Sequence, residues 1–474
     1  MGKTARMGRR PGPGAAIAPG TRFEIDVLSL AAAGDGVGRH DGIAVFVPQA
    51  APGDRLEVEV TDGAARFARA RIVAVLRAGP DRVGAPCPVY AACGGCAWQH
   101  IAYPAQCAWK RRLVVEALRR LGHVADPEPL VRPALPAEPP WRYRHKMAVP
   151  FAPPPRAGLP PMAGFYAARS HEIVPFETCA IQHPQLDRAL AETRRLAQRL
   201  GVPAYDERTR RGDLRHLVGR VSRDSGQLLL CLVTARPAAP WAARMASGLM
   251  SALPACVGVV QNVNGAPGNA ILGPETRTLA GADHLVETIG GLRFLVSAPS
   301  FFQVAPAQAE SLFATAVAQA DLGAGEAAFD LYAGVGTLTL FLARAGAFVE
   351  AVEEVPAAVA DGRANAAANG LEDRARFHLG PAESVVPDLV RRGRRPAVVV
   401  CDPPRRGAAA GVLEAVAAAR PRRVVYVSCN PATLARDVEL LAGAGYRLAE
   451  VQPVDMFPHT PHVECSALLQ REGP

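Results

Sequence analysis

The sequence predicts a multidomain fold with three parts: an N-terminal β-barrel, a central α+β domain, and a C-terminal α/β domain built on a doubly wound sheet. A chain of 474 residues is too long for one ordinary domain, and with 49% hydrophobic and 20% charged residues it can bury sizeable cores. Short strand-like runs crowd residues 21–78, whereas strand-like runs alternate with helical stretches over residues 290–474. Residues 79–289 mix both patterns and are expected to form the central domain.

The first 20 residues are basic, rich in proline and glycine, and have no apolar stretch. We therefore expect residues 1–20 to form a disordered tail and not a secretory signal. No run of about 18 apolar residues occurs, so no membrane-spanning helix is expected. Ten cysteines in a chain without a signal favour a reduced, cytoplasmic setting in which some of them serve a metal or catalysis.

A net charge of +9 favours a polyanionic partner, such as nucleic acid, over a membrane or a cationic substrate. The only lysines are Lys3, Lys110 and Lys146, so nearly all of the positive charge is arginine. Arginine suits bidentate phosphate contacts and stacking on bases. A compositional bias towards arginine in the genome explains part of the excess.

The barrel is predicted from four strand-like runs that are separated by turn signals. The runs are FEIDVLSL, IAVFVPQA, DRLEVEVTD and FARARIVAVL, and the turns are GDGVGRHDG and APGDR. So many short strands in so few residues suggest a small barrel of the oligonucleotide-binding kind. The segment GDGVGRHDGIAVFVPQAAPGD also resembles a TRAM domain, which implies RNA binding.

The central domain begins with a predicted helix over residues 103–122, which has a basic face and could pack on the C-terminal domain. A proline-rich linker over residues 126–140 follows, then strands at LLLCLVTA and CVGVVQNV and a helix around residues 186–200. Two basic segments, WRYRHK at 141–146 and the run at 208–215, offer contacts for RNA, and each could equally be a solvated edge or loop.

Three cysteines of this domain, Cys87, Cys93 and Cys96, follow the spacing C-x5-C-x2-C, with glycines between the last two. Tight spacing with small residues lets one loop wrap a metal or a cluster, and Cys179 is the best candidate for a fourth ligand. Four thiolates suit either zinc or an iron–sulfur cluster, and the spacing does not separate these two.

The C-terminal domain has a Rossmann-like cofactor turn in AAFDLYAGVGTLTLFLA, where an apolar strand leads through Gly334 and Gly336 into a helix. The next strand ends in Glu353, which could accept the ribose hydroxyls of an adenosine. The pattern predicts a nucleotide-type cofactor and leaves NAD open. Asp402-Pro403-Pro404 ends a later strand and places a carboxylate in the substrate crevice.

Cys429 lies where the following strand meets a helix start, with Asn430 and Pro431 suited to the cap and first turn. A thiolate at that point is expected to be stabilised by the helix dipole and nearby amides, which predicts a nucleophile. Glu464, in MFPHTPHVECSALLQ, is the candidate general base. His459 or His462 could serve instead, or all three could be structural.

The motifs SFFQVAPAQ, DLYAGVGTL, DPPR, VSCNP and PHTPHVECSALL occur in the order found in the RNA uracil-5-methyltransferase family, which this chain resembles closely over residues 290–474. The resemblance implies that Cys429 adds to carbon 6 of a uracil and that Glu464 removes the carbon-5 proton after methyl transfer. It further implies contacts with S-adenosylmethionine or the uracil from these residues: Gln303, Tyr332, Glu353 and Asp402.

The family usually has Asn where this chain has Ala305, and Thr337 replaces an Asn of some relatives, so no role is carried over to Ala305. Resemblance to the ribosomal-RNA branch implies a [4Fe–4S] cluster on the four cysteines and a uridine of 23S rRNA as the target. We also expect a monomer that binds no membrane. The alternatives are the same reaction on the T-loop uridine of tRNA, or a non-catalytic, metal-stabilised RNA-binding protein.

Overall fold

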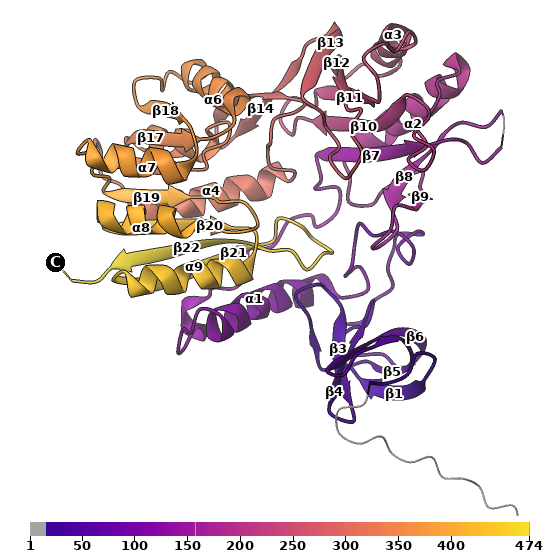
Figure 1. The fold of residues 1–474 in the computed structure, drawn as a ribbon, viewed down its shortest axis with the longest axis horizontal. Helices are drawn as coiled ribbons and strands as arrows, with labels where there is room; N and C mark the ends of the chain where they lie inside the picture. Colours follow the sequence, from indigo (N-terminus) through magenta and orange to yellow (C-terminus); the bar gives the residue numbers. More distant parts are fainter. Residues whose placement is uncertain (1–15, 157, 474) are drawn as a thin grey trace, which may run out of the picture. The chain divides into compact units, whose positions relative to one another are not determined.

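The computed structural model describes residues 16–156 and 158–473, so most of the expected tail lies outside the described residues (Figure 1). Contacts divide the chain into two compact units. The first comprises the chain up to Pro86, Cys96–Trp109 and His459–Pro461; the second comprises Cys87–Gly95, Lys110–Pro458 and His462–Pro474. Over the described ranges, no helix combines the length and the apolar character that crossing a membrane requires.

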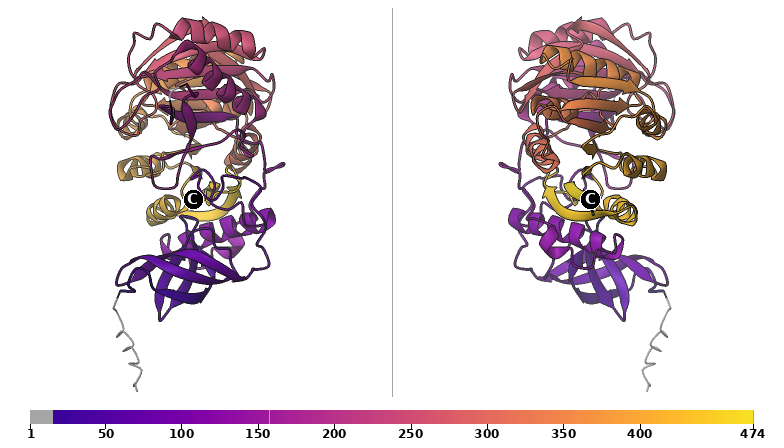
Figure 2. Two further views of the ribbon diagram at one scale, coloured as in Figure 1. Left: turned by 90° about the vertical axis from the view of Figure 1, so that its right-hand side faces the viewer. Right: turned by 90° about the vertical axis from the view of Figure 1, so that its left-hand side faces the viewer.

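The first unit holds a six-stranded sheet in the order β1-β5-β6-β4-β3-β2, which wraps around its own core (Figure 2). Alternate residues face inward, among them Leu56, Val58 and Val60 of one strand. This confirms the predicted N-terminal barrel. Its strands are β1 (Arg22–Asp26), β2 (Ser29–Leu30), β3 (Gly36–His40), β4 (Ile43–Val47), β5 (Arg55–Gly63) and β6 (Phe67–Arg77).

Strand β3 corrects one expectation, because its residues belong to the segment GDGVGRHDG that the sequence predicts as a turn. The strand is paired with β4 along its whole length. A Cβ atom at Gly38 would lie 2.5 Å from the carbonyl oxygen of Asp26, and one at Gly36 would lie 2.8 Å from the Cβ of Ala50. Glycine is present here because neighbouring backbone approaches too closely for a side chain, and the strand still forms.

Helix α1 (Tyr103–Arg120) matches the predicted helix, and from Lys110 onward it belongs to the second unit. Its residues Val114, Val115 and Leu118 are buried in the same core as the C-terminal sheet. The proline-rich segment after it is not a free linker. Its residues Val131 and Leu135 form parallel bridges to strand β21 (Tyr446–Val454), which covers that edge of the sheet.

A seven-stranded sheet in the order β13-β12-β11-β10-β7-β8-β9 forms the central part of the second unit. Helices α2 (Pro184–Leu200) and α3 (Ala242–Ala252) pack their buried residues into its core. The sheet contains β7 (Lys146–Ala152), β8 (Met162–Tyr166), β9 (Ile173–Pro175), β10 (Leu214–Val221), β11 (Leu228–Thr234), β12 (Cys256–Val263) and β13 (Glu275–Gly281). The predicted strands at LLLCLVTA and CVGVVQNV are β11 and β12.

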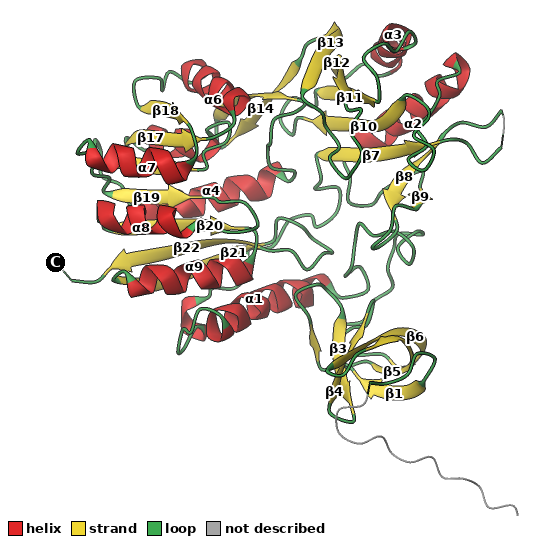
Figure 3. Ribbon diagram, viewed as in Figure 1, coloured by secondary structure: helices red, strands yellow, loops and turns green. Residues whose placement is uncertain are grey.

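The C-terminal part of the second unit alternates strands and helices, as the sequence predicts (Figure 3). A hairpin of β14 (His284–Ile289) and β15 (Leu292–Ser297) precedes it. The helices are α4 (Pro306–Ala320), α5 (Thr337–Arg344), α6 (Pro356–Ala368), α7 (Ala382–Arg391), α8 (Ala410–Ala419) and α9 (Pro431–Gly443). The strands before β21 are β16 (Ala327–Leu331), β17 (Phe348–Glu353), β18 (Ala375–Leu379), β19 (Val398–Cys401) and β20 (Arg423–Ser428), and β22 (Glu464–Arg471) follows it.

These strands form one sheet in the order β18-β17-β16-β19-β20-β22-β21. The first five are parallel, and β22 runs antiparallel to both of its neighbours. The strand order reverses between β16 and β19, which is the point where open α/β sheets bind ligands outside the carboxyl ends of the strands. The doubly wound α/β prediction is thereby confirmed.

Candidate active site

The turn between β16 and α5 forms one wall of the site. Tyr332 and Gly334 both have left-handed backbone conformations, with φ of 64° and 56°. The N–H of Gly334 donates to Oε2 of Glu353 at 2.9 Å, and the N–H of Val355 donates to Oε1 at 2.8 Å. Glu353 is therefore fixed at the end of β17 with its carboxylate against the glycine turn, as an acceptor for ligand hydroxyls would have to be.

Gly336 is required by the packing behind this turn. Its φ is 82°, and a Cβ atom there would lie 2.6 Å from Cζ of Phe377. Phe377 comes from β18, two strands away from β16 in the sheet, and its ring fills the space beneath the turn. Glycine thus serves both the left-handed conformation and the close contact.

Two carboxyl groups lie at the switch point, Asp330 buried and Asp402 half-buried. Asp330 accepts a hydrogen bond from Oγ1 of Thr339 at 2.5 Å, and burial raises its pKa to about 7. Asp402 follows β19, and burial raises its pKa to about 6. Asp330 is also repelled by the charges of Asp402 and Glu353, so these acidic groups share one electrostatic environment. Sequence analysis assigned no role to Asp330, because an acid inside an apolar strand gives no signal of its own.

Cys429 and Glu464 come from two strands that are paired. Ser428, the last residue of β20, is opposite Cys465 in β22, so the next residues along each strand, Cys429 and Glu464, meet at the same strand end. Cys429 is half-buried, whereas Glu464 is only 4% exposed. The fold therefore brings the predicted nucleophile and the predicted base together, although the two are 35 residues apart in sequence.

The thiol of Cys429 is not held as a thiolate in this structure, in contrast to the expectation from sequence. Burial raises its pKa to about 11, and the charges of Glu464 and Asp402 raise it further, while Arg405 acts in the opposite direction. The residue precedes Asn430, the N-cap of α9, and so lies outside the first helical turn. Burial and two carboxylates outweigh the helix terminus.

The pKa of Glu464 is raised as well, and Asp402 and Arg405 influence it as they influence Cys429. Burial and then the charge of Asp402 place the pKa of its carboxyl well above the usual range, and Arg405 lowers it. A carboxyl with a raised pKa is a stronger proton acceptor once it has ionised. Burial and nearby carboxylate charge thus favour the protonated forms of both Cys429 and Glu464 in the RNA-free protein.

Arg405 is a nearby cation to which sequence analysis assigned no catalytic or binding role. It is exposed, and its carbonyl oxygen accepts a hydrogen bond from Nδ2 of Asn430 at 3.0 Å and one from Oγ1 of Thr433 at 3.4 Å. Asn430 and Thr433, at the start of α9, thus hold the loop that carries this guanidinium. The sequence could have indicated this residue through its position, directly after Asp402-Pro403-Pro404 at the end of a strand.

Gln303 lies in the loop before α4 and is half-buried. The loop is held by two neighbours: the N–H of His145 donates to the carbonyl of Val304 at 2.7 Å, and Arg220 donates to the carbonyl of Ser300 at 2.8 Å. No hydrogen bond joins the Gln303 side chain to Cys429, Glu464 or Asp402. Ala305, the N-cap of α4, is buried and supplies no capping hydrogen bond.

The two histidines near Glu464 differ in their surroundings. Burial, Arg405 and Lys110 lower the pKa of His462, so it is neutral at physiological pH. His459 belongs to the first unit, where its Nδ1 lies 3.1 Å from Nε2 of Gln106 and its N–H donates to Oε1 of the same residue at 2.8 Å. Those two bonds to one glutamine give His459 a structural role in its own unit.

The predicted cluster cysteines fall in both units. Cys87, Cys93 and Cys179 belong to the second unit and Cys96 to the first. Charge on Cys87 raises the pKa of both Cys93 and Cys179, and burial is the larger cause in each case. No disulfide joins the ten cysteines, all of which are described. Among the described residues, no group of three or more His, Cys, Asp or Glu side chains is arranged to hold a metal ion.

Comparison with family models finds a TRAM domain over residues 18–73 and the tRNA (Uracil-5-)-methyltransferase family over residues 393–472. A protein from Halalkalibacterium halodurans, described as an uncharacterized RNA methyltransferase, is 41% identical over 447 residues, which cover 94% of this chain and 96% of the relative. A protein of the same description from Gloeobacter violaceus is 42% identical over 466 residues, covering 98% and 100%.

Among solved structures, the tRNA (uracil-54, C5)-methyltransferase of Pyrococcus abyssi, crystallised with S-adenosyl-L-homocysteine, is similar over nearly the whole chain. The TM-score is 0.74 and the identity 25%, covering 94% of this chain and 99% of that chain. The family model over residues 393–472 and this solved structure are thus both uracil-5-methyltransferases.

Proposed function

The chain belongs to the family of TRAM-containing RNA uracil-5-methyltransferases, and we propose that it methylates carbon 5 of a specific uridine in 23S ribosomal RNA. The reaction class, transfer of a methyl group from S-adenosylmethionine to RNA, follows from the family. The target RNA and the roles of single residues are the proposal. The observation that carries these roles is the meeting of Cys429 and Glu464 at one strand end, beside Asp402.

The residues at the switch point fit a bound S-adenosylmethionine, which supplies an electrophilic methyl group on its sulfonium. Glu353 is held by two backbone N–H groups, and the turn beside it has an unobstructed surface, since a Cβ atom at Gly334 would meet no atom within 4 Å. We propose that Glu353 accepts the ribose hydroxyls and that Tyr332 and Gln303 line the remainder of the cofactor site. Asp402 would contact the cofactor or the uracil.

Cys429 acts first in the proposed sequence. Its thiol loses a proton to solvent, and the thiolate forms a bond to carbon 6 of the uracil, which moves the electron pair of the C5–C6 double bond onto the ring as an enolate. Carbon 5 would then bond to the methyl group with this electron pair, and the bond from the methyl group to the sulfonium sulfur would break with its electron pair left on the sulfur. The raised pKa makes the thiolate scarce but more nucleophilic once formed.

Glu464 acts last. As a carboxylate it accepts the proton from carbon 5, the C–H electron pair restores the C5–C6 double bond, and the sulfur of Cys429 leaves carbon 6. The buried position of Glu464 and the charge of Asp402 raise its proton affinity, as this step requires. We propose that Arg405 favours ionisation of both groups and contacts the phosphate of the bound nucleotide.

The T-loop uridine of tRNA is the second candidate substrate. Similarity to the Pyrococcus abyssi enzyme supports this candidate, because that enzyme is a tRNA methyltransferase and the similarity covers 99% of its chain. The similarity to this tRNA enzyme spans 94% of the present chain. The length of the chain therefore does not by itself decide between rRNA and tRNA as the substrate. The proposal for rRNA rests on the cysteine pattern. A non-catalytic role would leave the paired Cys429 and Glu464 without a function.

We propose that Cys87, Cys93, Cys96 and Cys179 bind a [4Fe–4S] cluster in a reducing, cytoplasmic environment. Support comes from their spacing in the sequence and from the charge of Cys87, which raises the pKa of both Cys93 and Cys179. No catalytic step depends on this cluster. Anaerobically purified protein should be brown, absorb visible light, and contain iron and sulfide. Colourless protein with bound zinc would contradict the assignment.

The substrate proposal is tested with tritium-labelled S-adenosylmethionine and RNA from cells that lack the modification. Purified 23S rRNA and bulk tRNA are offered separately, and the labelled position is mapped by nuclease digestion and mass spectrometry. We expect 5-methyluridine in 23S rRNA. Label confined to tRNA would establish the second candidate, and label at a position other than carbon 5 of uracil would overturn the reaction.

A further inference from the structure

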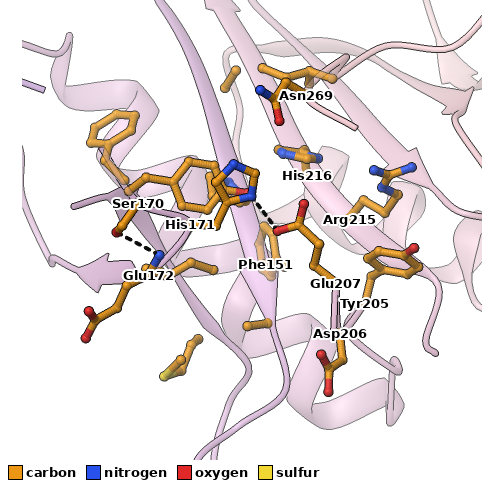
Figure 4. Close-up of a pocket in the computed structure, with 18 of the residues that line it drawn as sticks. Phe151, Ser170, His171, Glu172, Tyr205, Asp206, Glu207, Arg215, His216 and Asn269 are labelled. Atoms are coloured by element: carbon orange, nitrogen blue, oxygen red, sulfur yellow. Dashed lines mark hydrogen bonds and ion pairs between the residues drawn. The ribbon is translucent and has the colours of Figure 1, made fainter. Parts of the chain in front are cut away.

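A large cavity in the central part of the second unit lies outside the residues assigned to methyl transfer. Its volume is about 1290 Å³, larger than the roughly 300–1,000 Å³ that is usual for small-molecule sites. It is lined by strands β7, β8 and β9, by the turn at 205–208, by the start of β10 and by the loop at 268–271 (Figure 4). The methyltransferase proposal uses none of these side chains.

Aromatic rings form much of the wall. Phe151, Phe165, Tyr166 and Tyr205 line the cavity. The guanidinium of Arg215 lies 4.8 Å from the centre of the Tyr205 ring. Aromatic and guanidinium planes are the surfaces on which proteins stack bases that have left a helical stack, and such stacking tolerates any base.

Polar groups without partners lie among these rings. Nδ1 of His216 and Nε of Arg215 are buried and make no hydrogen bond, and the two residues are 9% and 5% exposed. Burial lowers the pKa of His216 to about 4, so its ring is neutral at physiological pH and offers one donor and one acceptor nitrogen. Figure 4 shows Arg215 and His216 side by side with Asn269, opposite the ion pair of His171 and Glu207, whose atoms are 2.8 Å apart.

A second hollow adjoins the cavity, and Tyr205 lines both. It has a volume of about 430 Å³ and is lined by three arginines, Arg210, Arg211 and Arg236. The turn that carries two of them is well braced: Oδ1 of Asp206 accepts the N–H of Arg208 at 2.9 Å. The basic run at 208–215 therefore starts in a braced turn, continues into β10, and presents positive charge beside the aromatic cavity.

We propose that this cavity receives an unstacked base of the substrate RNA, other than the target uridine, and that the neighbouring arginines hold its phosphate. The proposal rests on the chain being an RNA methyltransferase and adds a second nucleotide site to it. The carboxylates of the wall do not suit phosphate, but Glu207 and Asp206 can accept N–H groups from a base edge. The aromatic rings suit the face of a base, the carboxylates suit its edge, and the adjoining arginines suit its phosphate.

The test compares Tyr205→Ala with Tyr205→Phe in the full-length protein, using substrate RNA binding and methylation kinetics. We expect Tyr205→Ala to weaken RNA binding and raise KM roughly tenfold or more, with kcat little changed, and Tyr205→Phe to behave as the wild type. Thermal melts establish that both variants are folded. In a second arm, Arg211→Glu should weaken RNA binding, whereas the matched control Arg195→Glu, on α2 outside both hollows, should not.

Photocrosslinking supplies a direct readout that does not depend on any variant. RNA carrying 4-thiouridine at single positions should form a crosslink to a peptide of the cavity wall from a position other than the target. Unchanged binding by Tyr205→Ala, or crosslinks confined to other segments, would overturn the proposal. So would a free nucleoside monophosphate that fills the cavity without weakening RNA binding. Failure of the methyltransferase proposal is recognised separately, because wild-type protein would then form no covalent complex with 5-fluorouridine RNA.

Discussion

At the scale of single residues, the proposed chemistry uses Cys429, Glu464, Asp402 and Arg405, whose charges influence one another. Burial and the charge of Asp402 raise the pKa of both Cys429 and Glu464, and the charge of Arg405 lowers both. A half-buried thiol that is mostly protonated is protected from alkylation and oxidation when no RNA is bound. The same arrangement makes activity sensitive to any change in the charge of Asp402 or Arg405.

The thiol of Cys429 should therefore react slowly with iodoacetamide at neutral pH. The reactive form is the thiolate, and with a pKa of about 11 its fraction at pH 8 is on the order of one part in a thousand. The alkylation rate, followed by mass spectrometry of the peptide that contains Cys429, should rise with pH and reach its midpoint near 11. An ordinary thiol has its midpoint near about 8.5.

Two variants give this prediction its controls. Asp402→Asn removes a negative charge and should move the midpoint to lower pH, whereas Arg405→Ala removes the cation and should move it to higher pH. A wild-type midpoint at or below that of an ordinary thiol would show that the helix terminus dominates after all. Shifts of the same sign in both variants would contradict the electrostatic explanation.

At the scale of elements, the turn between β16 and α5 connects packing to cofactor binding. Gly336→Ala should lower the free energy of unfolding by about 2 kcal/mol or more, because it combines a left-handed backbone with a clash against Phe377. It should also weaken S-adenosylhomocysteine binding, since the displaced turn carries Gly334 and its bond to Glu353. Chemical denaturation and calorimetric titration measure the two effects.

Gly411→Ala is the matched control for that substitution. Gly411 lies in α8, and a Cβ atom there would meet nothing within 4 Å. The control should be neutral or stabilising by up to about 1 kcal/mol. If both variants behave alike, the close packing of Gly336 on Phe377 is not what holds the turn.

Helix α1 is fixed by a buried ion pair. Nζ of Lys110 donates to a carboxylate oxygen of Asp455 and, at 2.9 Å, to the carbonyl of Phe457, and both charged side chains are fully buried. Lys110→Met should destabilise the protein by about 3–5 kcal/mol, because it leaves the charge of Asp455 buried without a partner.

The double variant Lys110→Met with Asp455→Leu separates this cause from simple loss of packing. Removing both charges should recover most of the lost stability in chemical denaturation. A double variant as unstable as the single one would mean that the lysine contributes through its contacts with the chain and not through its charge.

The sequence predicted most of the C-terminal sheet because strands β16 to β20 are continuous apolar runs, and a buried parallel strand has that pattern. It did not predict β3, whose glycines resemble a turn when their close neighbours are unknown. The pairing of Val131 and Leu135 with β21 was also missed, because it depends on residues more than 300 positions away. That Cys429 and Glu464 belong to one site was predictable from their motifs. The raised pKa of the thiol was not, since it arises from tertiary neighbours.

At the scale of the whole molecule, the net charge of +9 is carried almost entirely by arginine. Contacts between arginine and phosphate release counterions, so the affinity for RNA should fall linearly with salt on logarithmic axes. S-adenosylhomocysteine binding should change little over the same range, because the cofactor turn has no arginine partner. Filter binding and calorimetry at several salt concentrations measure both. An RNA affinity that is independent of salt would contradict recognition through the phosphates.

The proposal that Cys429 is a covalent nucleophile assisted by Glu464 is tested most directly with RNA that carries 5-fluorouridine at the target position. Wild-type protein with S-adenosylmethionine should form a complex that survives denaturing electrophoresis, and peptide mapping should place the bond on Cys429, because fluorine cannot leave as a proton does. Cys429→Ala should form no complex, whereas Glu464→Gln should accumulate one even on ordinary uridine RNA. A stable complex with Cys429→Ala, or full turnover by that variant, would contradict the covalent role of Cys429.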